Sequence, residues 1–390
     1  MSVIVAGIGE TLMGKYPDRS IYEMIREAGH AALDEAGIDS SLITAAYIGN
    51  FNGQQLLGQG HFGPLVMETL GMSHVPAMRV EGACVSGGLA LLQGVEAIRS
   101  GRHQAVLVGG VEKMTHQTTA AVTSALTSAM DIEFEAHSGL SFPGSFALVA
   151  HRYFHEFRNV QREMAQVAVN AHDNALLNPT AQMHKKIDID KVLNAPRIAD
   201  PLGLYDCSLV TDGAAFIVLV SEELAQQLDD GAERHRQVRI IGSGHGGDAL
   251  TLHGKASMTT FGATIRAAKQ AYAQAGVEAS DIDLAEVHDC FTITQIINTE
   301  DLGFFEKGHG GDAVAEGRTA RDGDMPINVS GGLKAKGHPI GATGISQAIE
   351  VITQIRGGAG ERQSNKVDTG LTHNLGGTAG TCVINIFQGA

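Results

Sequence analysis

Cys84 is the residue of this sequence whose setting best suits nucleophilic chemistry. It lies among small residues, in the run GACVSGG (82–88), directly before an apolar helical pattern. That pattern predicts that Cys84 stands at the first turn of a buried helix. Free backbone N–H groups and the positive end of the helix dipole would stabilise a thiolate there. For a cysteine considered alone, the competing interpretation is a structural thiol packed under the helix.

Three further stretches offer groups that could work with this thiol. They are EVHDCF (286–291) at the end of a predicted strand, the Gly-rich run 331–341 that contains His338, and HNLGGTAG (373–380). Strand ends and helix starts are where α/β folds place ligands, so the stretches are candidates to converge. Cysteines and histidines together favour a thiolate with an acid/base partner. A metal site is the alternative, although the separations show no metal-ligand spacing.

The elements that would position these residues occur twice in the chain. In each half an Ala-rich helical pattern leads through a short Gly-containing turn into a strand, and each half carries one apolar helix. The similar segments, in the same order, are 3–9 and 238–244, 36–43 and 275–282, and the helices after Cys84 and from Gly341 to Arg356. This repetition predicts a duplicated βαβ-type unit with one central buried helix in each copy.

The predicted boundaries follow from this duplication. The first half comprises residues 1–115 and 206–222, a polar linker spans 223–237, and the second half spans 238–390. Residues 116–205 break the α/β rhythm, and we interpret them as an inserted loop domain that covers a pocket; a plain surface excursion is the alternative. The candidates for the pocket wall are Met130, Phe134, His137, Phe142 and Phe146.

One glycine motif of the second half is misleading. Gly242, Gly244 and Gly247 satisfy GxGxxG after a predicted strand, but the residues that follow, 248–255, are polar and irregular. Without a helix N-terminus to meet a pyrophosphate, the motif does not predict a dinucleotide site.

Composition excludes several classes of protein. The 390 residues include 49 glycines and no tryptophan, and 43% are hydrophobic, which is typical of an α/β protein. The net charge of −15 argues against nucleic acid or an anionic membrane as partner. No run reaches the roughly 18 apolar residues that span a bilayer. The N-terminus reads as a strand rather than a signal peptide, and the C-terminus is no peroxisomal address. The four cysteines form no CxxC pair, which favours a reducing compartment, the cytoplasm.

Taken together, the motifs resemble the thiolase family over nearly the whole chain. Residues 82–88 are similar to its Cys-x-Ser nucleophile motif, and Gly337-His338-Pro339 to its Gly-His-Pro loop. HDCF (288–291) and PLGLYDCS (201–208) are typical of the branch that contains sterol-carrier-protein and archaeal acetoacetyl-CoA thiolases. The resemblance implies an α/β thiolase fold: two βαβ-type halves in a five-layer αβαβα sandwich, an inserted loop domain, and a homodimer or higher homo-oligomer.

The family also implies a role for each catalytic residue. His338 would take the proton of Cys84, whose thiolate would attack a 3-oxoacyl-CoA and hold the acyl group until free CoA removes it. The same groups would run the reverse Claisen condensation. His288 with His338 would form one oxyanion hole, and the backbone N–H groups of Cys84 and Gly376 a second. Coenzyme A is then a co-substrate, and no permanently bound cofactor or metal is expected.

The chain departs from the family pattern near its C-terminus. Most thiolases carry a second reactive cysteine in a Cys-x-Gly motif, where this chain has Asn374-Leu375-Gly376. Asparagine cannot shuttle a proton at neutral pH. The branch resemblance implies that Cys290 supplies this acid/base step, with His373 as the reserve candidate and Asn374 as a polar partner. We expect Cys207 and Cys382 to be structural.

Two other functions stay open at this point. One is a 3-oxoacyl synthase or acyltransferase, in which His288 and His338 would imitate the paired histidines of decarboxylating synthases; the other is an inactive scaffold. Substrates of the branch include acetoacetyl-CoA, branched or sterol-derived 3-oxoacyl-CoAs and benzoylsuccinyl-CoA. Some members work with a small partner carrying an OB-fold and a zinc ribbon, and the resemblance extends that expectation to this chain. We expect neither nucleic acid nor a membrane as partner.

Overall fold

The computed structural model describes residues 2–228, 236–365 and 367–390. Its main sheet has the strand order β3-β2-β4-β7-β1-β8-β11-β10-β9 in the described residues. The bounds of these strands are β1 Val3–Glu10, β2 Ala46–Gly49, β3 Ala77–Val80, β4 Ala105–Glu112, β7 Gly213–Ser221, β8 Val238–Gly247, β9 Leu284–Glu286, β10 Thr369–Gly376 and β11 Thr381–Gly389.

The sheet consists of two similar parts that join where β1 pairs with β8. In the first part β2 and β4 are parallel neighbours, and β7 lies antiparallel between β4 and β1. In the second part β9 and β10 are parallel, and β11 lies antiparallel between β10 and β8. A parallel bridge from Ala285 to Ile327 takes the place that β3 has in the first part. The predicted duplication is therefore a property of the fold.

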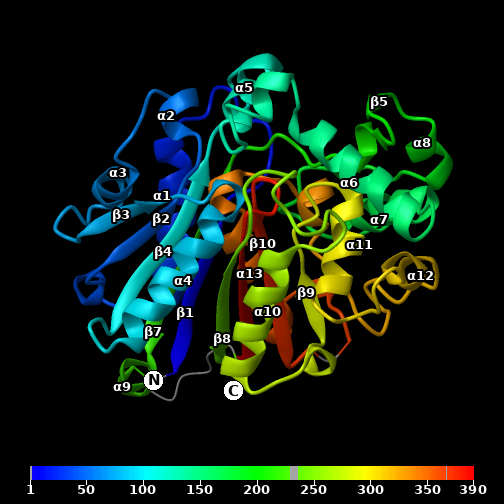
Figure 1. Cartoon of the computed structure of the whole chain (residues 1–390). Coiled ribbons are helices and arrows are strands. Elements are labelled where there is room, and N and C mark those ends of the chain that lie inside the picture. The colour runs from blue at the N-terminus through cyan, green and yellow to red at the C-terminus, as the bar shows by residue number, and fades with distance from the viewer. Residues whose placement is uncertain (1, 229–235, 366) are drawn as a thin grey trace.

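The helices complete five layers (Figure 1). The central layer consists of α4 and α13, which contact each other and both parts of the sheet, while α1 and α10 cover the outer faces. Both outer helices end at a glycine in the left-handed region, Gly37 and Gly276, and each is followed by a 3-10 turn. This is the predicted αβαβα sandwich. The bounds are α1 Ile21–Ala36, η1 Ser40–Leu42, α4 Ser86–Arg99, α10 Gly262–Ala275, η5 Ala279–Asp281 and α13 Ile340–Ile355.

Glycines at alternate strand positions explain how closely the outer helices approach. A Cβ at Gly7 would lie 2.2 Å from a carbonyl oxygen of α1, and one at Gly244 would lie 2.0 Å from a carbonyl oxygen of α10. Only glycine permits this contact between helix and strand. The GxGxxG of the second half thus lies within β8 (Val238–Gly247), where its first two glycines admit α10.

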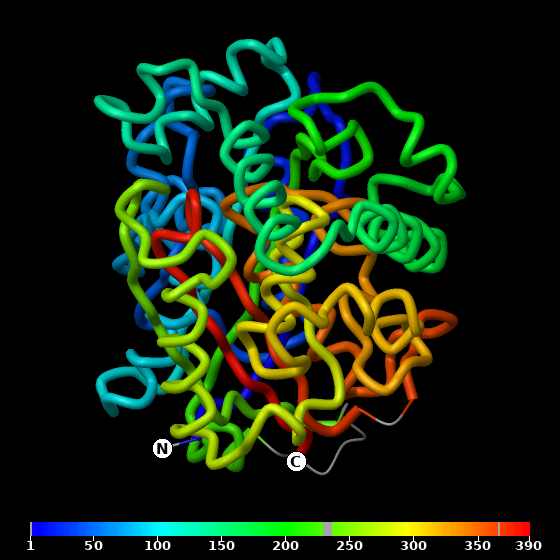
Figure 2. Tube along the Cα trace, turned by 45° about the vertical axis from the view of Figure 1, so that its right-hand side comes forward, coloured from blue at the N-terminus to red at the C-terminus, as the bar shows by residue number. Residues whose placement is uncertain are grey.

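The segment between β4 and β7 forms a cap over one end of both halves, far from the two chain termini (Figures 1 and 2). We expected an inserted loop domain without the regular α/β pattern here, and the cap is largely helical. The apolar positions of α6 recur at helical spacing and face the core, which the abundance of Thr, Ser and Met obscured. Its elements are α5 Thr119–Thr127, η3 Ala136–Ser138, α6 Phe142–Glu156, α7 Gln161–Leu176, α8 Ile189–Leu193, β5 Arg197–Ala199, β6 Leu202–Gly203 and η4 Leu204–Asp206.

The predicted linker 223–237 begins within a short helix, α9 (Glu222–Gln227), and its residues 229–235 lie outside the described residues. Among the residues that the structure describes, no helix has both the length and the apolar character needed to cross a bilayer. The remaining elements are α2 Gly53–Leu56, α3 Phe62–Thr69, η2 Ala83–Val85, α11 Thr292–Asp301, α12 Gly310–Ala315, the π-helical turn η6 Gly332–Lys336 and η7 Gly360–Arg362.

Candidate active site

Cys84 lies in a 3-10 turn that runs directly into α4, as the sequence predicts. The residue before it, Ala83, has a φ of 55°, in the left-handed region that alanine rarely adopts. Side chains hold this turn. The Ser86 hydroxyl accepts from the Gly82 N–H at 3.0 Å and donates to the Ala83 carbonyl at 2.6 Å, and the Glu81 carboxylate accepts from the Ala83 N–H at 2.6 Å. The serine of the Cys-x-Ser motif therefore fixes the conformation that presents the thiol.

The electrostatics of Cys84 differ from the expectation of a stabilised thiolate. Burial raises the pKa of its thiol to about 12, although the nearby backbone N–H groups of Gly377 and of Cys84 itself lower it. Glu112 and Glu81 raise it further. Loss of hydration outweighs the helix terminus, so the free enzyme holds a neutral thiol.

His338 lies on the Gly-rich loop before α13, and its ring has a defined tautomer. Its Nδ1 lies 2.7 Å from the Thr343 hydroxyl, which itself donates to the Pro339 carbonyl at 3.1 Å. The hydroxyl must therefore accept from Nδ1–H, which leaves Nε2 unprotonated. Nε2 is buried and has no partner among the described residues. Burial lowers the pKa of His338 to about 3, so the ring is a neutral base.

His288 completes a cluster around the thiol. The Cys84 sulfur and one ring nitrogen each of His288 and His338 all lie within 4.8 Å of one another. The centroids of the two imidazole rings are 5.2 Å apart, and the rings pack edge to face. The sequence separations gave no sign of this proximity. A thiol with two imidazoles could also hold zinc or a similar transition metal. Such an ion would occupy the nucleophile and its base, so metal binding and the proposed catalysis exclude each other here.

The HDCF stretch also holds the loop that carries His338. Asp289 accepts a hydrogen bond from the Leu333 N–H at 2.7 Å, and a Cβ at Gly332 would lie 2.3 Å from its carboxylate. Burial raises the pKa of Asp289 to about 6.

The next residue, Cys290, is partly exposed, and its sulfur lies 3.9 Å from the Thr294 hydroxyl. Burial and the neighbouring Cys84 raise the pKa of the Cys290 thiol well above its usual value.

Cys84, Cys290 and His338 line one apolar cavity of about 320 Å³, which we call the cysteine cavity. It lies under the cap, whose helices α5 and α6 supply part of the wall. Of the five predicted wall residues, Phe142 and Phe146 line it. The prediction for Phe134 and His137 is wrong, because both side chains are exposed, and Met130 lines a different cavity. Cys207, expected to be structural, lines the cysteine cavity as well.

His373 and Asn374 do not line the cysteine cavity. The His373 ring faces α10, where Nε2 lies 3.0 Å from the Thr264 hydroxyl, and its Nδ1 accepts from the His288 N–H at 3.3 Å. Asn374 faces the opposite way, into the crossing of the central helices, where it donates to Gln347. Its oxygen fills the space that a Cβ at Gly88 or Gly344 would need. His373 thus positions the backbone of His288, and Asn374 packs the central layer.

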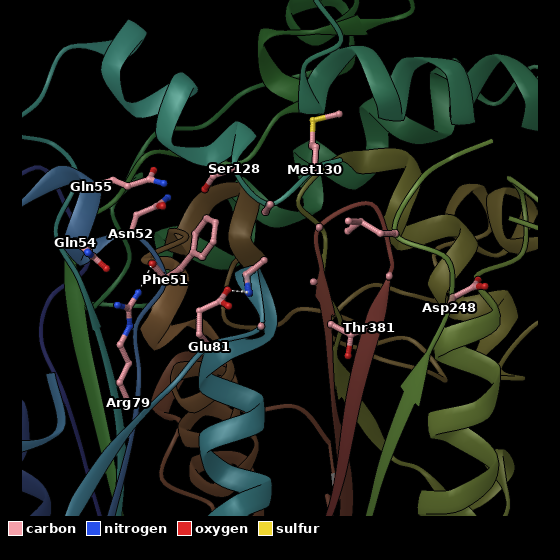
Figure 3. Close-up of a pocket in the computed structure, with 17 residues that line it drawn as sticks. Phe51, Asn52, Gln54, Gln55, Arg79, Glu81, Ser128, Met130, Asp248 and Thr381 are labelled. Carbon is pink, nitrogen blue, oxygen red and sulfur yellow. Dashed lines mark hydrogen bonds between the residues drawn. The ribbon is translucent and has the colours of Figure 1, made fainter. Parts of the chain in front are cut away.

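The structure also shows which N–H groups surround the thiol. Gly377 lines the cysteine cavity, and its backbone N–H lowers the pKa of the Cys84 thiol. Gly376 lines a larger and more open cavity of about 770 Å³ on the other side of the nucleophile turn. Figure 3 shows this cavity between the Phe51–Gln55 segment and the β10–β11 hairpin, with Glu81 and Arg79 on its floor.

Glu112 is a buried residue beside the site that the sequence did not single out. Its buried carboxylate accepts from the backbone N–H groups of Phe51, Asn52 and Gly341 and from the Asn50 amide. Gly341 lies three residues after His338, so this carboxylate ties the second half of the chain to the first beside the nucleophile. Burial raises the pKa of Glu112 to about 7. In the sequence, the only sign of this residue is that a single acidic residue ends the apolar strand β4.

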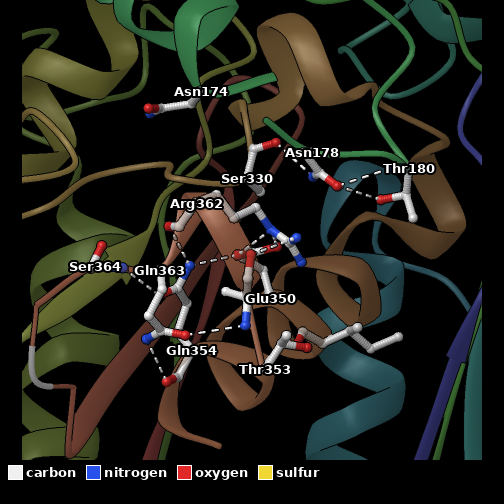
Figure 4. A network of polar contacts seen from close by, with 12 residues as sticks. Asn174, Asn178, Thr180, Ser330, Glu350, Thr353, Gln354, Arg362, Gln363 and Ser364 are labelled. Atoms are coloured by element: carbon white, nitrogen blue, oxygen red, sulfur yellow. Dashed lines mark hydrogen bonds and ion pairs between the residues drawn. The ribbon is translucent and has the colours of Figure 1, made fainter. Parts of the chain in front are cut away.

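Further polar contacts hold α13 and the start of the His338 loop, and Figure 4 labels Glu350 and Ser330 among their residues. Glu350 of α13 accepts from Arg362 at 3.0 Å and from Gln354 at 2.9 Å. Glu286 accepts from the hydroxyl and the N–H of Ser330, at 2.6 and 3.0 Å. These groups join β9, α13 and the start of the loop, and none of them lines either of the two cavities described above, so we assign them to the scaffold.

Comparison with known proteins identifies the family. Residues 2–223 match the N-terminal domain of thiolase and residues 244–389 the thiolase C-terminal domain-like family. The chain is 43% identical over 386 residues to the acetyl-CoA acetyltransferase of Methanothermobacter thermautotrophicus, with 99% of each chain covered. It is 32% identical to sterol carrier protein 2 of Oryctolagus cuniculus, with 99% of this chain and 72% of that protein covered.

A solved structure has a similar fold. The Ltp2-ChsH2(DUF35) aldolase is similar to this chain with a TM-score of 0.84 and 25% sequence identity, over 100% of this chain and 98% of that one. The cysteine and histidine motifs, the duplicated five-layer sandwich and the two family matches agree with one another. The chain belongs to the thiolase family and is an acyltransferase of that family.

Proposed function

We propose that this thiolase cleaves a 3-oxoacyl-CoA with coenzyme A, or runs the reverse Claisen condensation, through an acyl-Cys84 intermediate. The observation that carries the proposal is that Cys84, His338 and Cys290, from the two halves of the chain, line one apolar cavity under the cap.

In the cleavage direction, the proton of Cys84 passes to Nε2 of His338 while the sulfur attacks the 3-oxo carbon. The resulting oxyanion then collapses, the bond between carbons 2 and 3 breaks, and its electron pair forms the enolate of the departing acyl-CoA. Cys290 gives its proton to carbon 2 of that enolate. A thiol with a raised pKa is protonated at neutral pH and thus ready to act as the acid.

Free coenzyme A completes the cycle. The Cys290 thiolate takes the proton of the CoA thiol, which attacks the acyl-Cys84 thioester, and the departing Cys84 sulfur recovers its proton from His338. Once His338 is protonated, its Nε2–H can donate to an oxyanion together with His288. The backbone N–H of Cys84, with that of Gly376 or of its neighbour Gly377, can form the second oxyanion hole.

The wall of the cysteine cavity favours an acyl group larger than acetyl. Four phenylalanines line it, Phe51, Phe142, Phe146 and Phe291, and two of them stack with ring centroids 4.8 Å apart. Bulky or aromatic 3-oxoacyl-CoAs, of which benzoylsuccinyl-CoA is one, are therefore the proposed substrates beside acetoacetyl-CoA. The paired imidazoles of His288 and His338 favour one second candidate, a decarboxylating 3-oxoacyl synthase.

Substitution of Cys290 by alanine tests the proposal, with Cys207→Ala as the matched control because both thiols line the same cavity. We expect Cys290→Ala to lower thiolytic turnover by about 100-fold or more, because the enolate loses its proton donor, while Cys84 is still acylated. Cys207→Ala should retain turnover. Near-normal cleavage by the Cys290→Ala enzyme would contradict the assignment, and malonyl-CoA decarboxylation would identify a synthase instead.

We also propose that two copies associate through β3, which ends the sheet with an unpaired edge in the described residues and leaves Met78 53% exposed.

The name of the solved aldolase pairs Ltp2 with a DUF35 component. By analogy, a small OB-fold and zinc-ribbon protein is the proposed partner, and copurification from the native source tests it. The four free cysteines fit the proposed cytoplasmic location.

A further inference from the structure

A second cavity adjoins the cysteine cavity, and its charge is unusual for this protein. It has a volume of about 370 Å³, and the segment Cys207–Val210 lines both cavities. Two lysines, Lys15 and Lys334, line this second cavity, and no aspartate or glutamate does. In a chain of net charge −15, a concave site with two cations and no acid selects for negative charge. We call it the lysine cavity.

Lys334 is buried without the partners that other buried lysines have. It is 2% exposed, compared with 6% for Lys113 and 4% for Lys336. Lys113 donates to the Tyr16 carbonyl at 2.6 Å and lies 3.6 Å from Asp212; Lys336 lies 3.1 Å from Glu10. Among the described residues, no carboxylate oxygen lies within 4.0 Å of the Lys334 Nζ, and none of their oxygens accepts a hydrogen bond from it.

The surroundings of Lys334 leave its ammonium group available to a ligand. Nζ lies 5.8 Å from the centre of the Tyr205 ring, which also lines the lysine cavity. The nearby carboxylates are already occupied: Asp206 accepts from Thr292 at 2.6 Å and from the Gly203 N–H at 2.8 Å, and Asp289 accepts from the Leu333 N–H. Three ammonium donors without protein acceptors are costly unless a ligand or water supplies the acceptors.

From this arrangement we infer that Lys334 binds a carboxylate at the far end of the substrate's acyl chain. The inference rests on the proposed function, and it names a substrate class: 3-oxoacyl-CoA thioesters with an acidic group on the acyl side. Lys15, at the rim, and the hydroxyl of Ser208 are further cavity groups that could contact the carboxylate.

Lys334 lies close enough to the reacting groups to meet the acyl chain, and this favours an acyl-chain carboxylate over the phosphates of coenzyme A as its ligand. Lys334 precedes His338 by four residues, so their Cα atoms are at most about 14 Å apart. The shared wall at Cys207–Val210 places the lysine cavity next to the cavity that holds the reacting carbons. The phosphates lie at the other end of the pantetheine arm, away from the thioester.

The experiment compares matched pairs of thioesters: a series of 3-oxoacyl-CoAs with a terminal carboxylate, each with the methyl-terminated compound of equal chain length. For the wild-type enzyme we expect one chain length at which the carboxylate raises kcat/KM by about ten- to a hundredfold. In Lys334→Met the ratio should fall to about one. Lys269→Met removes an equal charge from the exposed face of α10 and should keep the wild-type ratio.

Two results would overturn the inference. One is a wild-type enzyme without preference for the carboxylate at any chain length, a comparison that needs no variant to fold. The other is a Lys334→Met enzyme whose kcat/KM falls by the same factor for the carboxylate-terminated and the methyl-terminated thioester. That result would mean that Lys334 binds coenzyme A or supports the scaffold. If no thioester is cleaved, the proposed function fails, and dissociation constants of the same pairs on Cys84→Ala still report on the carboxylate site.

Discussion

Cys84 and His338 both rest in their uncharged forms because burial disfavours either charge. The thiol has a pKa of about 12 and the imidazole one of about 3, so no thiolate–imidazolium pair forms in the free enzyme. In the proposed mechanism, proton transfer is therefore coupled to attack on the substrate, whose developing oxyanion meets N–H donors. The sequence suggests a stabilised thiolate, because a helix terminus can be read from residue order whereas the loss of hydration cannot.

Alkylation of Cys84 by iodoacetamide tests this protonation state. Only the thiolate reacts, so the rate should rise continuously from neutral pH to about pH 10. Mass spectrometry of the peptide that contains Cys84 separates its modification from that of the other three cysteines. A rate that is already maximal at about pH 7 would show that the thiolate forms in the free enzyme.

Thr343 is a positioning residue for His338, because its hydroxyl accepts from Nδ1–H and so keeps the lone pair on Nε2. We expect Thr343→Val to lower kcat by about tenfold or more and to change the pH profile of kcat, since the wrong tautomer becomes accessible. Thr343→Ser, which keeps the hydroxyl, should restore both. Equal losses in the valine and serine variants would mean that the methyl group, and hence packing, is what matters.

At the scale of elements, the site exists because α4 and α13 begin side by side. Cys84 precedes one helix and His338 the other, and the two helices pack as the central layer. Glu112, at the end of β4, holds the start of α13 by accepting from the Gly341 N–H and holds the Phe51–Asn52 turn by accepting from its N–H groups. Glu112 thus holds the start of α13 against the Phe51–Asn52 turn, while the direct packing of α4 on α13 aligns the two helix starts.

Glu112→Gln should therefore destabilise the fold as well as the site. An amide nitrogen would face backbone N–H donors that need an acceptor, at an expected cost of about 3 kcal/mol in the free energy of unfolding. Urea denaturation measures this cost, and Glu316→Gln, on an exposed position, serves as control. Stability within about 0.5 kcal/mol of the wild type would show that the carboxylate does not hold the helix start.

At the scale of the whole molecule, buried acids near the site make the free energy of unfolding depend on pH. Burial and the nearby Glu350 raise the pKa of Glu286 to about 8, and burial raises that of Glu112 to about 7, both from 4.5. The folded chain then binds protons that the unfolded chain has released, so stability decreases as pH rises through this window. Buried histidines such as His338 and His373 oppose this trend only below their unfolded pKa of about 6.5.

Between about pH 6.5 and pH 8 we therefore expect the free energy of unfolding to fall with rising pH, by on the order of 1 kcal/mol per pH unit. Glu286→Gln should flatten this slope, because the amide does not titrate. Urea denaturation at several pH values in this interval measures it. A wild-type stability that is constant or increases over the interval would contradict the raised pKa of the buried acids.

The sequence by itself determined the duplication, the elements that carry it and the reacting residue types. Repeated segments, helical periodicity and the position of Cys84 before an apolar helix are local properties, and the structure retains them. The insertion was misjudged in its helicity, since its amphipathic pattern is masked by polar residues, and two of its five proposed wall residues are exposed.

Only the tertiary structure decided which of the candidate residues meet. His373 and Asn374 are neighbours in sequence, yet alternation along β10 sends one side chain to the outer helix and the other to the central layer, away from the cysteine cavity. Gly377, Glu112 and Lys334 matter through neighbours that are distant in the sequence: Cys84, Gly341 and Tyr205. Residue order contains no information on the hydration, charge balance and hydrogen-bond capacity that remain after folding, and these quantities set the chemistry of a buried site.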